Sequence, residues 1–350
     1  MHTHCKIGSH HIGHPHPCFI IAEAGVNHNG DIMLARQLID AAAAAGADAV
    51  KFQTFRTERL VTTAAPKAAY QQQTTGATES QATMLQRLEL STEDHRTLAA
   101  CAAARGILFL STPFDEESAT FLVEMGVSAI KLSSGDVTNL PLLRHVAGLG
   151  KPVILSTGMA YLSEVDEAVR TLQTAGCVDL ILLQCVTNYP AAAADSNLRV
   201  MQTLAQAFGT MVGYSDHTIG NAVPLAAVAL GACMIEKHLT LDRALDGPDH
   251  QASTTPDALR ELVQDIRTIE SALGTGVKVP TPSEQPIALV ARRSLYLRDD
   301  LAAGAPVTWD ALIALRPGDG IPPGLAHLVV GRQAACTLSA GTRLQWGDLR

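Results

Sequence analysis

The stretch that decides the fold runs from Met211 to Thr240 and reads MVGYSDHTIGNAVPLAAVALGACMIEKHLT. It contains two short apolar segments that end in polar clusters, and an alanine-rich segment over about 219–230 lies between them. This order predicts a strand, a helix and a second strand, in which the crossover helix returns the second strand parallel to the first. Both strands then end at the same edge of the sheet, which is where parallel sheets carry their chemistry.

Two histidines stand at these predicted strand ends. Parallel pairing predicts that His217 and His238 lie side by side, and the period of two along a strand places Glu236 on the same face as His238. Two imidazoles and a carboxylate can hold a metal ion. Two hydrogen-bonded histidines without a metal are the purely structural alternative.

The same alternation continues back to the start of the chain. Strands are predicted to end near Glu23, Gln53, Thr112, Ser134, Ser156, Thr187, Ser215 and His238. Helices are predicted over about 31–45, 92–105, 116–125, 140–149, 163–175, 198–208 and 256–273. Eight strand-helix repeats over about 260 residues predict a (β/α)8 barrel, with a doubly wound open sheet as the alternative.

Three segments lie outside these repeats. The first seventeen residues hold six histidines and predict a small β-hairpin, for which a metal-capturing tail is the minor alternative. Residues 55–90 have no strand pattern and predict a partly helical loop over the site. Residues 274–286 have a linker composition, and the short β-like stretches beyond them predict a small, mostly β domain over 287–350, after a barrel domain over 1–273.

The composition narrows the class of protein. A hydrophobic content of 47% with 17% charged residues suits a parallel sheet covered on both faces. A net charge of -8 without a long Lys/Arg cluster argues against nucleic-acid and membrane-surface partners, and the lack of a long apolar run argues against a transmembrane helix. The amino terminus has no signal-peptide pattern, and the seven scattered cysteines predict reduced thiols in the cytoplasm. Cys185, at a strand end without a nearby base, is expected to be a packing residue.

Two lysines lie inside predicted strands. Lysine is rarely buried unpaired, so Lys51 and Lys131 should each meet an anion or a carboxylate. A Lys51–Glu23 ion pair is the structural alternative. Hydroxyl groups from several strand ends beside Lys131 could donate to the oxygens of one phosphate, which this fold often binds at its upper face.

Several motifs follow one another in the order found in the sialic acid synthase family: FIIAEAGVNHNG, GADAVKFQTF, STPFD, KLSSGD, PVILSTGM, GYSDHT, EKHLTLD with GPDH, and LRPGDGI. From about Ile7 to the carboxyl terminus, the chain resembles this family. The resemblance implies a (β/α)8 barrel followed by an antifreeze-like (SAF) domain. It also implies a transferase that condenses phosphoenolpyruvate (PEP) with an N-acylated mannosamine-type sugar, releases phosphate and uses Mn²⁺ or Mg²⁺.

The resemblance also assigns roles by position. It implies that His217 and His238 are the metal ligands and that Glu23, Lys51, Lys131 and Asp136 are catalytic. The implied PEP contacts are Lys51, Thr112, Lys131, Ser134, Ser156, Thr187 and Ser215, and the implied sugar contacts are Glu23, Gln53, Tyr189, Asp249 and Arg316. Arg316 would reach the N-acyl group in a partner's site, which implies a domain-swapped homodimer. Asp136 and Thr187 stand where some members have Glu and Asn, and the shorter carboxylate of Asp136 reaches less far.

The sequence does not decide which sugar is the substrate. N-acetylmannosamine, which would yield N-acetylneuraminate, is the first expectation, and a 2,4-diacetamido-6-deoxy sugar that would yield legionaminate or a relative is the alternative. Two other classes compete with the synthase. One is a Schiff-base aldolase that uses Lys51 or Lys131, against which the histidine pair argues. The other is a non-catalytic binding protein, which fold alone does not exclude but the many polar side chains at the strand ends disfavour.

Overall fold

The computed structural model describes residues 4–76 and 78–350. It divides into two compact units, Met1–Gly274 and Thr275–Arg350. Eight parallel strands of the first unit form one sheet in the order β5-β4-β3-β10-β9-β8-β7-β6, and β5 and β6 lie against each other to close it. The predicted (β/α)8 barrel is therefore confirmed. The strands are β3 (Phe19–Gly25), β4 (Ala49–Thr54), β5 (Leu108–Pro113), β6 (Ile130–Leu132), β7 (Val153–Ser156), β8 (Leu180–Cys185), β9 (Met211–Asp216) and β10 (Met234–His238).

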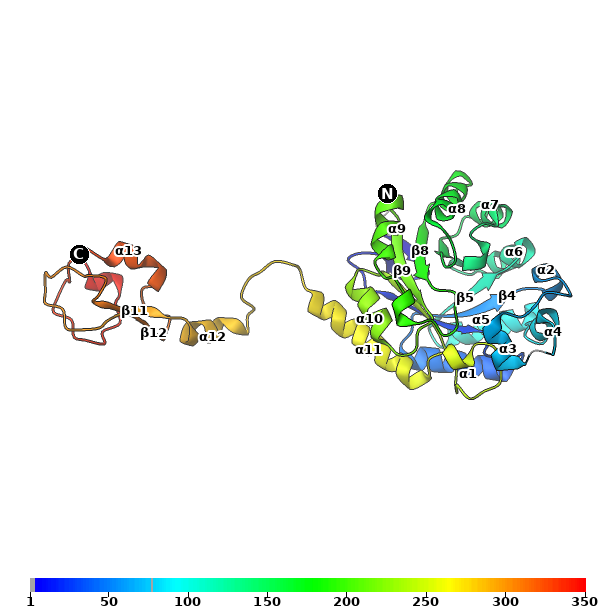
Figure 1. Cartoon of the computed structure of the whole chain (residues 1–350), viewed down its shortest axis with the longest axis horizontal. Helices are drawn as coiled ribbons and strands as arrows, with labels where there is room; N and C mark the ends of the chain where they lie inside the picture. Colours follow the sequence, from blue (N-terminus) through cyan, green and yellow to red (C-terminus); the bar gives the residue numbers. More distant parts are fainter. Residues whose placement is uncertain (1–3, 77) are drawn as a thin grey trace. The chain divides into compact units, whose positions relative to one another are not determined.

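Helices surround these strands, as Figure 1 shows. They begin and end within a few residues of the predicted bounds, because local signals fix their ends. Asp31 caps the first helix by accepting a hydrogen bond from the backbone of Met33, and Gly46 ends it with a φ of 84°. The helices are α1 (Ile32–Ala45), α5 (Thr92–Ala104), α6 (Glu116–Glu124), α7 (Leu140–Gly148), α8 (Leu162–Thr174), α9 (Val200–Phe208), α10 (Ala222–Ala229) and α11 (Pro256–Leu273).

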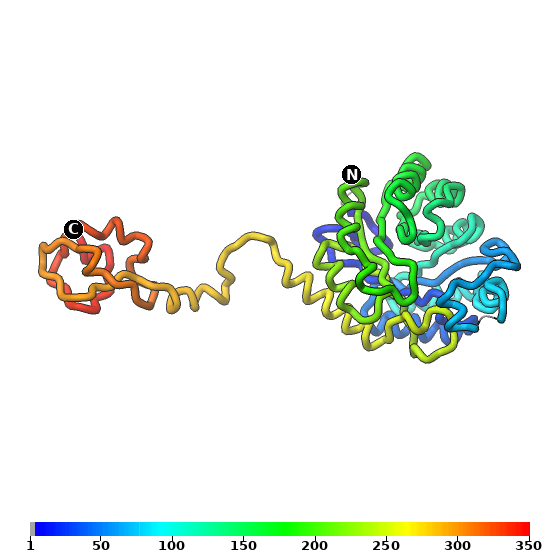
Figure 2. The backbone as a smooth tube through the Cα atoms, viewed as in Figure 1, coloured from blue at the N-terminus to red at the C-terminus, as the bar shows by residue number. Residues whose placement is uncertain are grey.

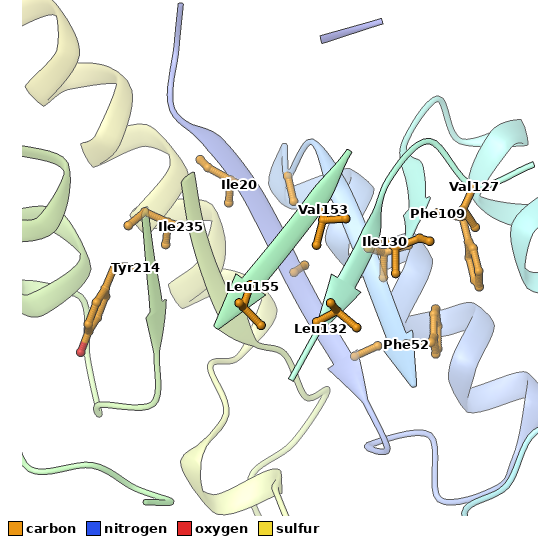
Figure 3. Packing of buried hydrophobic residues seen from close by; sticks show 14 of the residues in the cluster. Ile20, Phe52, Phe109, Val127, Ile130, Leu132, Val153, Leu155, Tyr214 and Ile235 are labelled. Atoms are coloured by element: carbon orange, nitrogen blue, oxygen red, sulfur yellow. The ribbon is translucent and has the colours of Figure 1, made fainter. Parts of the chain in front are cut away.

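The largest core fills the space between the strands and the helices. Figure 3 shows Ile20, Ile130, Val153, Leu155 and Ile235 from four different strands within this core. The residues of the opposite strand face point into the barrel. Near the amino-terminal ends of the strands they pack against a hairpin of β1 (Cys5–Ile7) and β2 (His10–Ile12). The hairpin predicted from the sequence is thus present, whereas His2 lies outside the described residues.

Residues 55–90 form three short helices joined by loops. These are α2 (Thr57–Leu60), α3 (Ala69–Thr75) and α4 (Gln81–Gln86). Met84 and Leu88 are buried in a small apolar cluster with Val26 and Phe55, which attaches this segment to the loops at the carboxyl ends of β3 and β4. The prediction of a partly helical segment is confirmed.

The second unit has a small core of its own. Its two antiparallel strands are β11 (Ser294–Leu297) and β12 (Leu312–Leu315), with the short helix α13 (Ala326–Val329) farther along the chain. Buried residues of this core include Leu295, Val307 and Leu344. Helix α12 (Glu284–Ala291) begins inside the segment that the sequence suggested as a linker. Figure 2 follows the chain from α11 through this segment. Within the described residues, no helix is both long and apolar enough to span a membrane.

Candidate active site

A cavity of about 200 Å³ lies at the carboxyl ends of the barrel strands. Side chains from many separate strand ends line it, because parallel strands with crossover helices all end at this edge. Most of the residues that the sequence suggested as site residues meet here: Glu23, Lys51, Gln53, Thr112, Lys131, Ser134, Ser156, Thr187, Tyr189, Ser215, His217 and His238.

Two lysines and two glutamates form the charged centre of the cavity. Lys51 Nζ lies 2.6 Å from Glu23 Oε2 and 3.7 Å from Glu236 Oε2, and Lys131 Nζ lies 3.5 Å from Glu236 Oε1. All four side chains are buried. The Lys51–Glu23 pair considered from the sequence is therefore present, but it belongs to a larger network. Glu236 bridges the two lysines and also accepts a hydrogen bond of 3.0 Å from Ser215 Oγ.

The surroundings shift the pKa values of the two lysines in opposite directions. Burial disfavours the charge on Lys51, but the carboxylates of Glu23 and Glu236 more than offset this and raise its pKa. Burial lowers the pKa of Lys131, and the more distant Glu236 compensates only in part. Burial also raises the pKa of Glu23, although Lys51 opposes the rise. An incoming anion would therefore raise the pKa of Lys131 and favour its charged form.

Several polar atoms in the cavity lack a hydrogen-bond partner among the residues that the structure describes. They include Ser156 Oγ, Glu236 Oε2 and His238 Nδ1. An unpaired buried polar atom costs about 1–3 kcal/mol. Such atoms gathered around one cavity indicate that a polar ligand binds there.

The histidine pair has the chemistry of a partial metal site. The rings of His217 and His238 lie 5.3 Å apart between centroids. His217 Nδ1 donates a hydrogen bond of 2.6 Å to the carbonyl oxygen of Val186, which leaves the Nε2 lone pair free when the ring is neutral. Burial lowers the pKa of His217, but Cys185 and the carbonyl group of Val186 more than offset this and raise it. Burial, together with the nearby His217, lowers the pKa of His238 well below its usual value.

The protein alone supplies few ligands at this point. Within residues 4–76 and 78–350, no group of three or more His, Cys, Asp or Glu side chains has the arrangement of a metal site. The closest carboxylate contact of His238 is Asp249, whose Oδ2 lies 3.9 Å from Nδ1. Two imidazoles, of which His238 has an Nδ1 atom without a hydrogen-bond partner, fit a divalent cation that takes its remaining ligands from water or substrate.

A stack of aromatic rings covers the histidine pair. The Tyr189 ring lies 4.0 Å from that of His217 and meets the His238 ring edge-on at 5.4 Å. Tyr70, on α3, stacks on Tyr189 at 5.1 Å. The sequence suggested Tyr189 but not Tyr70, because Tyr70 lies in a segment without periodicity; its only signal was an aromatic residue in a polar stretch.

The expectation that Cys185 has no base nearby is wrong. Its Sγ lies 3.8 Å from Nδ1 of the His217 ring, which comes from the end of the neighbouring strand β9 rather than from the same segment of sequence. Burial raises the pKa of a thiol, but His217 more than offsets this and lowers the pKa of Cys185. All seven cysteines are free thiols in the described structure.

Three suggested residues do not line the cavity. Asp136 ends a 3-10 turn (Ser134–Asp136), where its carboxylate accepts hydrogen bonds from Ser133 Oγ at 3.0 Å and Asn139 Nδ2 at 3.3 Å. Asp249 lies beside His238, and burial raises its pKa to about 6. Arg316 belongs to the second unit and is exposed.

Comparison with known proteins identifies two families. The model of the NeuB family matches residues 38–278, which is more than half of the chain. The model of the SAF domain matches residues 292–350, so the predicted SAF domain is confirmed.

Individual relatives resemble the chain over nearly its full length. The N,N'-diacetyllegionaminic acid synthase of Legionella pneumophila is 50% identical over 333 residues, which cover 94% of each chain. The enzyme of the same name from Campylobacter jejuni is 49% identical over 304 residues, covering 86% of this chain and 91% of the relative. Among solved structures, the N-acetylneuraminic acid (sialic acid) synthetase of Leptospira borgpetersenii has a TM-score of 0.72 with 38% identity, and covers 81% of this chain and 94% of its own.

Proposed function

The chain belongs to the NeuB family, and from this premise we propose that it is a PEP-condensing nonulosonic acid synthase that acts on a 2,4-diacetamido-6-deoxy sugar and forms N,N'-diacetyllegionaminate. The arrangement of Lys51, Lys131 and the two imidazoles around one cavity carries the synthase assignment. The higher identity to the diacetyllegionaminic acid synthases supports the diacetamido sugar over N-acetylmannosamine, which was the first expectation from the sequence.

The reaction joins carbon 3 of PEP to the aldehyde carbon of the open-chain sugar. Water adds at carbon 2 of PEP, and the bond between that carbon and the phosphate oxygen then breaks. The products are the nonulosonate and inorganic phosphate. The protein has to neutralise the phosphate, hold the aldehyde beside carbon 3 and manage the protons of the added water.

Lys131 and the hydroxyl groups of the cavity suit the binding of PEP. Lys131 Nζ lies 3.5 Å from Glu236 Oε1, farther than Lys51 lies from Glu23, and Ser156 Oγ lacks a hydrogen-bond partner within the described chain. A phosphate would accept hydrogen bonds from both and would raise the pKa of Lys131 again. Thr112, Ser134, Thr187 and Ser215 are further candidates for hydrogen bonds to PEP, because they line the same cavity.

His217 and His238 would hold a divalent cation, Mn²⁺ or Mg²⁺, which when bound supplies a Lewis acid for the aldehyde oxygen. Tyr189 packs on both rings and keeps them in place. Gln53 and Asp249 lie near the histidine pair and suit the binding of sugar hydroxyl groups.

Glu23 is the proposed proton carrier. Its raised pKa allows it to take up a proton near neutral pH, and Oε2 lies 2.6 Å from the ammonium group of Lys51. Lys51 keeps its own proton because its pKa is raised, so Glu23 is the member of the pair that would exchange one. Asp136 lies near the cavity, and we propose that it positions a water molecule.

Arg316 is proposed to act in a dimer. It is exposed on the second unit, where a partner's sugar could reach it. Mixing an Arg316→Ala variant with a Lys131→Met variant tests this proposal. In a swapped heterodimer, one active site would combine the intact Lys131 of one subunit with the intact Arg316 of the other, so activity would return. The absence of any recovery in verified heterodimers would contradict it.

Phosphate release from PEP by the purified protein tests the function. The diacetamido sugar and N-acetylmannosamine are offered in parallel, with Mn²⁺ and with a chelator. We expect phosphate release that depends on the metal and is faster with the diacetamido sugar. Lys131→Met should abolish this release. Lys278→Met, which changes an exposed lysine, is the control and should not. A stable adduct after borohydride treatment with substrate would favour an aldolase instead.

A further inference from the structure

A second cavity, of about 480 Å³, lies in the first unit. Its walls come from the segment 55–90 and from the loops that follow β3 and β10. Thr74, Met84, Arg87 and Leu88 line it on one side, and Asn29 and Pro248 line it on the other. The roles proposed above use none of these residues.

The segment 55–90 contributes side chains to both cavities. On α3, Tyr70 lines the active-site cavity and Thr74, one turn later, lines the second. Pro248 lines the second cavity, and the next residue, Asp249, lies against His238. Thr74 Oγ1 also donates a hydrogen bond of 3.4 Å to the carbonyl oxygen of Pro248. The second cavity therefore adjoins the side of the active site on which the sugar would lie.

The active-site cavity is too small for both substrates. At about 200 Å³ it falls below the roughly 300–1,000 Å³ of cavities that bury a single drug-sized ligand. PEP is held at Lys131 and the sugar aldehyde at the histidine pair, so the far end of the sugar must extend elsewhere. The adjoining cavity offers this space.

The lining of the second cavity suits an acetamido group. Met84 and Leu88 are buried apolar residues that can pack against its methyl group. The Arg87 side chain is 63% exposed and donates one hydrogen bond to Glu79, so further N–H groups remain to donate to an acetamido carbonyl oxygen. A hydroxyl group, which N-acetylmannosamine carries in place of the second acetamido group, would leave the apolar part of the cavity unfilled.

We propose that this second cavity receives the sugar substituents farthest from the aldehyde and thereby selects a diacetamido sugar over N-acetylmannosamine. The inference rests on the proposed function and adds the residues that determine specificity. Thr74, Met84, Arg87 and Leu88 belong to the segment 55–90, so this segment sets the choice of sugar while the strand ends carry out the chemistry.

Filling the cavity tests the inference. In Thr74→Phe the larger ring occupies the space, and we expect the ratio of kcat/KM for the diacetamido sugar to that for N-acetylmannosamine to fall at least ~10-fold, which is within the range of one pocket contact. Gln73→Phe is the matched control, because Gln73 lies on the same helix, is exposed and does not line the cavity. The ratio should stay at the wild-type value in this control.

Arg87→Met gives a second readout without adding bulk. It keeps an unbranched side chain but removes the N–H donors, so KM for the diacetamido sugar should rise several-fold more than KM for N-acetylmannosamine. If the ratio of kcat/KM for the two sugars is the same in Thr74→Phe, Gln73→Phe and the wild type, the cavity assignment is overturned even if the wild type is an active synthase. A wild type that turns over PEP with neither sugar would instead overturn the proposed function, and the inference with it.

Discussion

Lys237 and Asp216 form an ion pair between the ends of β10 and β9, and both side chains are fully buried. The two residues are direct partners in the strand register. Lys237 Nζ also donates to the carbonyl oxygen of Thr218 at 2.8 Å, and Asp216 Oδ1 accepts from the backbone of Thr218 at 3.0 Å. His238 and His217 each follow a member of this pair along the chain, so the pair fixes the spacing of the two strand ends that carry the imidazoles.

Removing one member of this pair should destabilise the protein strongly. Lys237→Met leaves the Asp216 carboxylate buried without compensation, and we expect the free energy of unfolding to fall by about 3–5 kcal/mol. Urea denaturation followed by circular dichroism measures it. Adding Asp216→Leu to Lys237→Met should restore part of the loss, because the second change removes the stranded charge. A loss below about 1 kcal/mol in the single variant would show that the carboxylate finds another partner.

Loss of either imidazole should abolish metal-dependent turnover. We expect His238→Ala and His217→Ala to release no phosphate above background with Mn²⁺, and to bind Mn²⁺ at least ~10-fold more weakly, because each change removes one of two protein ligands. Titration calorimetry measures the binding. His11→Ala, which changes an exposed histidine of the hairpin, is the control and should behave as wild type. Substantial activity in His217→Ala would contradict the metal assignment.

His28 should make the stability depend on pH. Burial, together with the nearby His95, lowers its pKa from 6.5 to about 4. The folded-state pKa lies below the unfolded-state value. The part of the stability that depends on neutral His28 is therefore fully present above pH 6.5 and is lost as the pH falls through about 4. The contribution amounts to roughly 3 kcal/mol. Denaturation midpoints measured at several pH values should depend less steeply on pH in His28→Asn than in the wild type. An unchanged dependence on pH would refute the assignment to His28.

Gly158 should tolerate no side chain, because it lies against two residues of the active-site cavity. A Cβ atom there would lie 2.3 Å from Thr187 Oγ1 and 3.0 Å from Ser134 Oγ. We expect Gly158→Ala to displace both hydroxyl groups, to raise KM for PEP and to lower the free energy of unfolding by about 1–3 kcal/mol. Steady-state kinetics and denaturation measure the two effects. Gly148→Ala is the control because no atom lies within 4 Å of its Cβ position, and a normal KM in Gly158→Ala would argue against Thr187 and Ser134 as PEP contacts.

The sequence by itself determined the barrel and most of the cavity. Alternating strands and helices with right-handed crossovers leave few topologies, and the parallel arrangement brings every strand end to one edge. Lys51, Lys131, His217 and His238 could therefore be assigned to one site from their positions in the repeats alone. The order of the motifs then indicated the family.

Only the tertiary structure decided what lies above that edge. The path of residues 55–90 follows no periodic pattern, so neither the stack of Tyr70 on Tyr189 nor the second cavity could be read from the sequence. The neighbours of Cys185 and Lys237 also come from adjacent strands rather than adjacent residues. Strand periodicity fixes which face a side chain takes, whereas the partner it meets there depends on how segments far apart in the chain pack together.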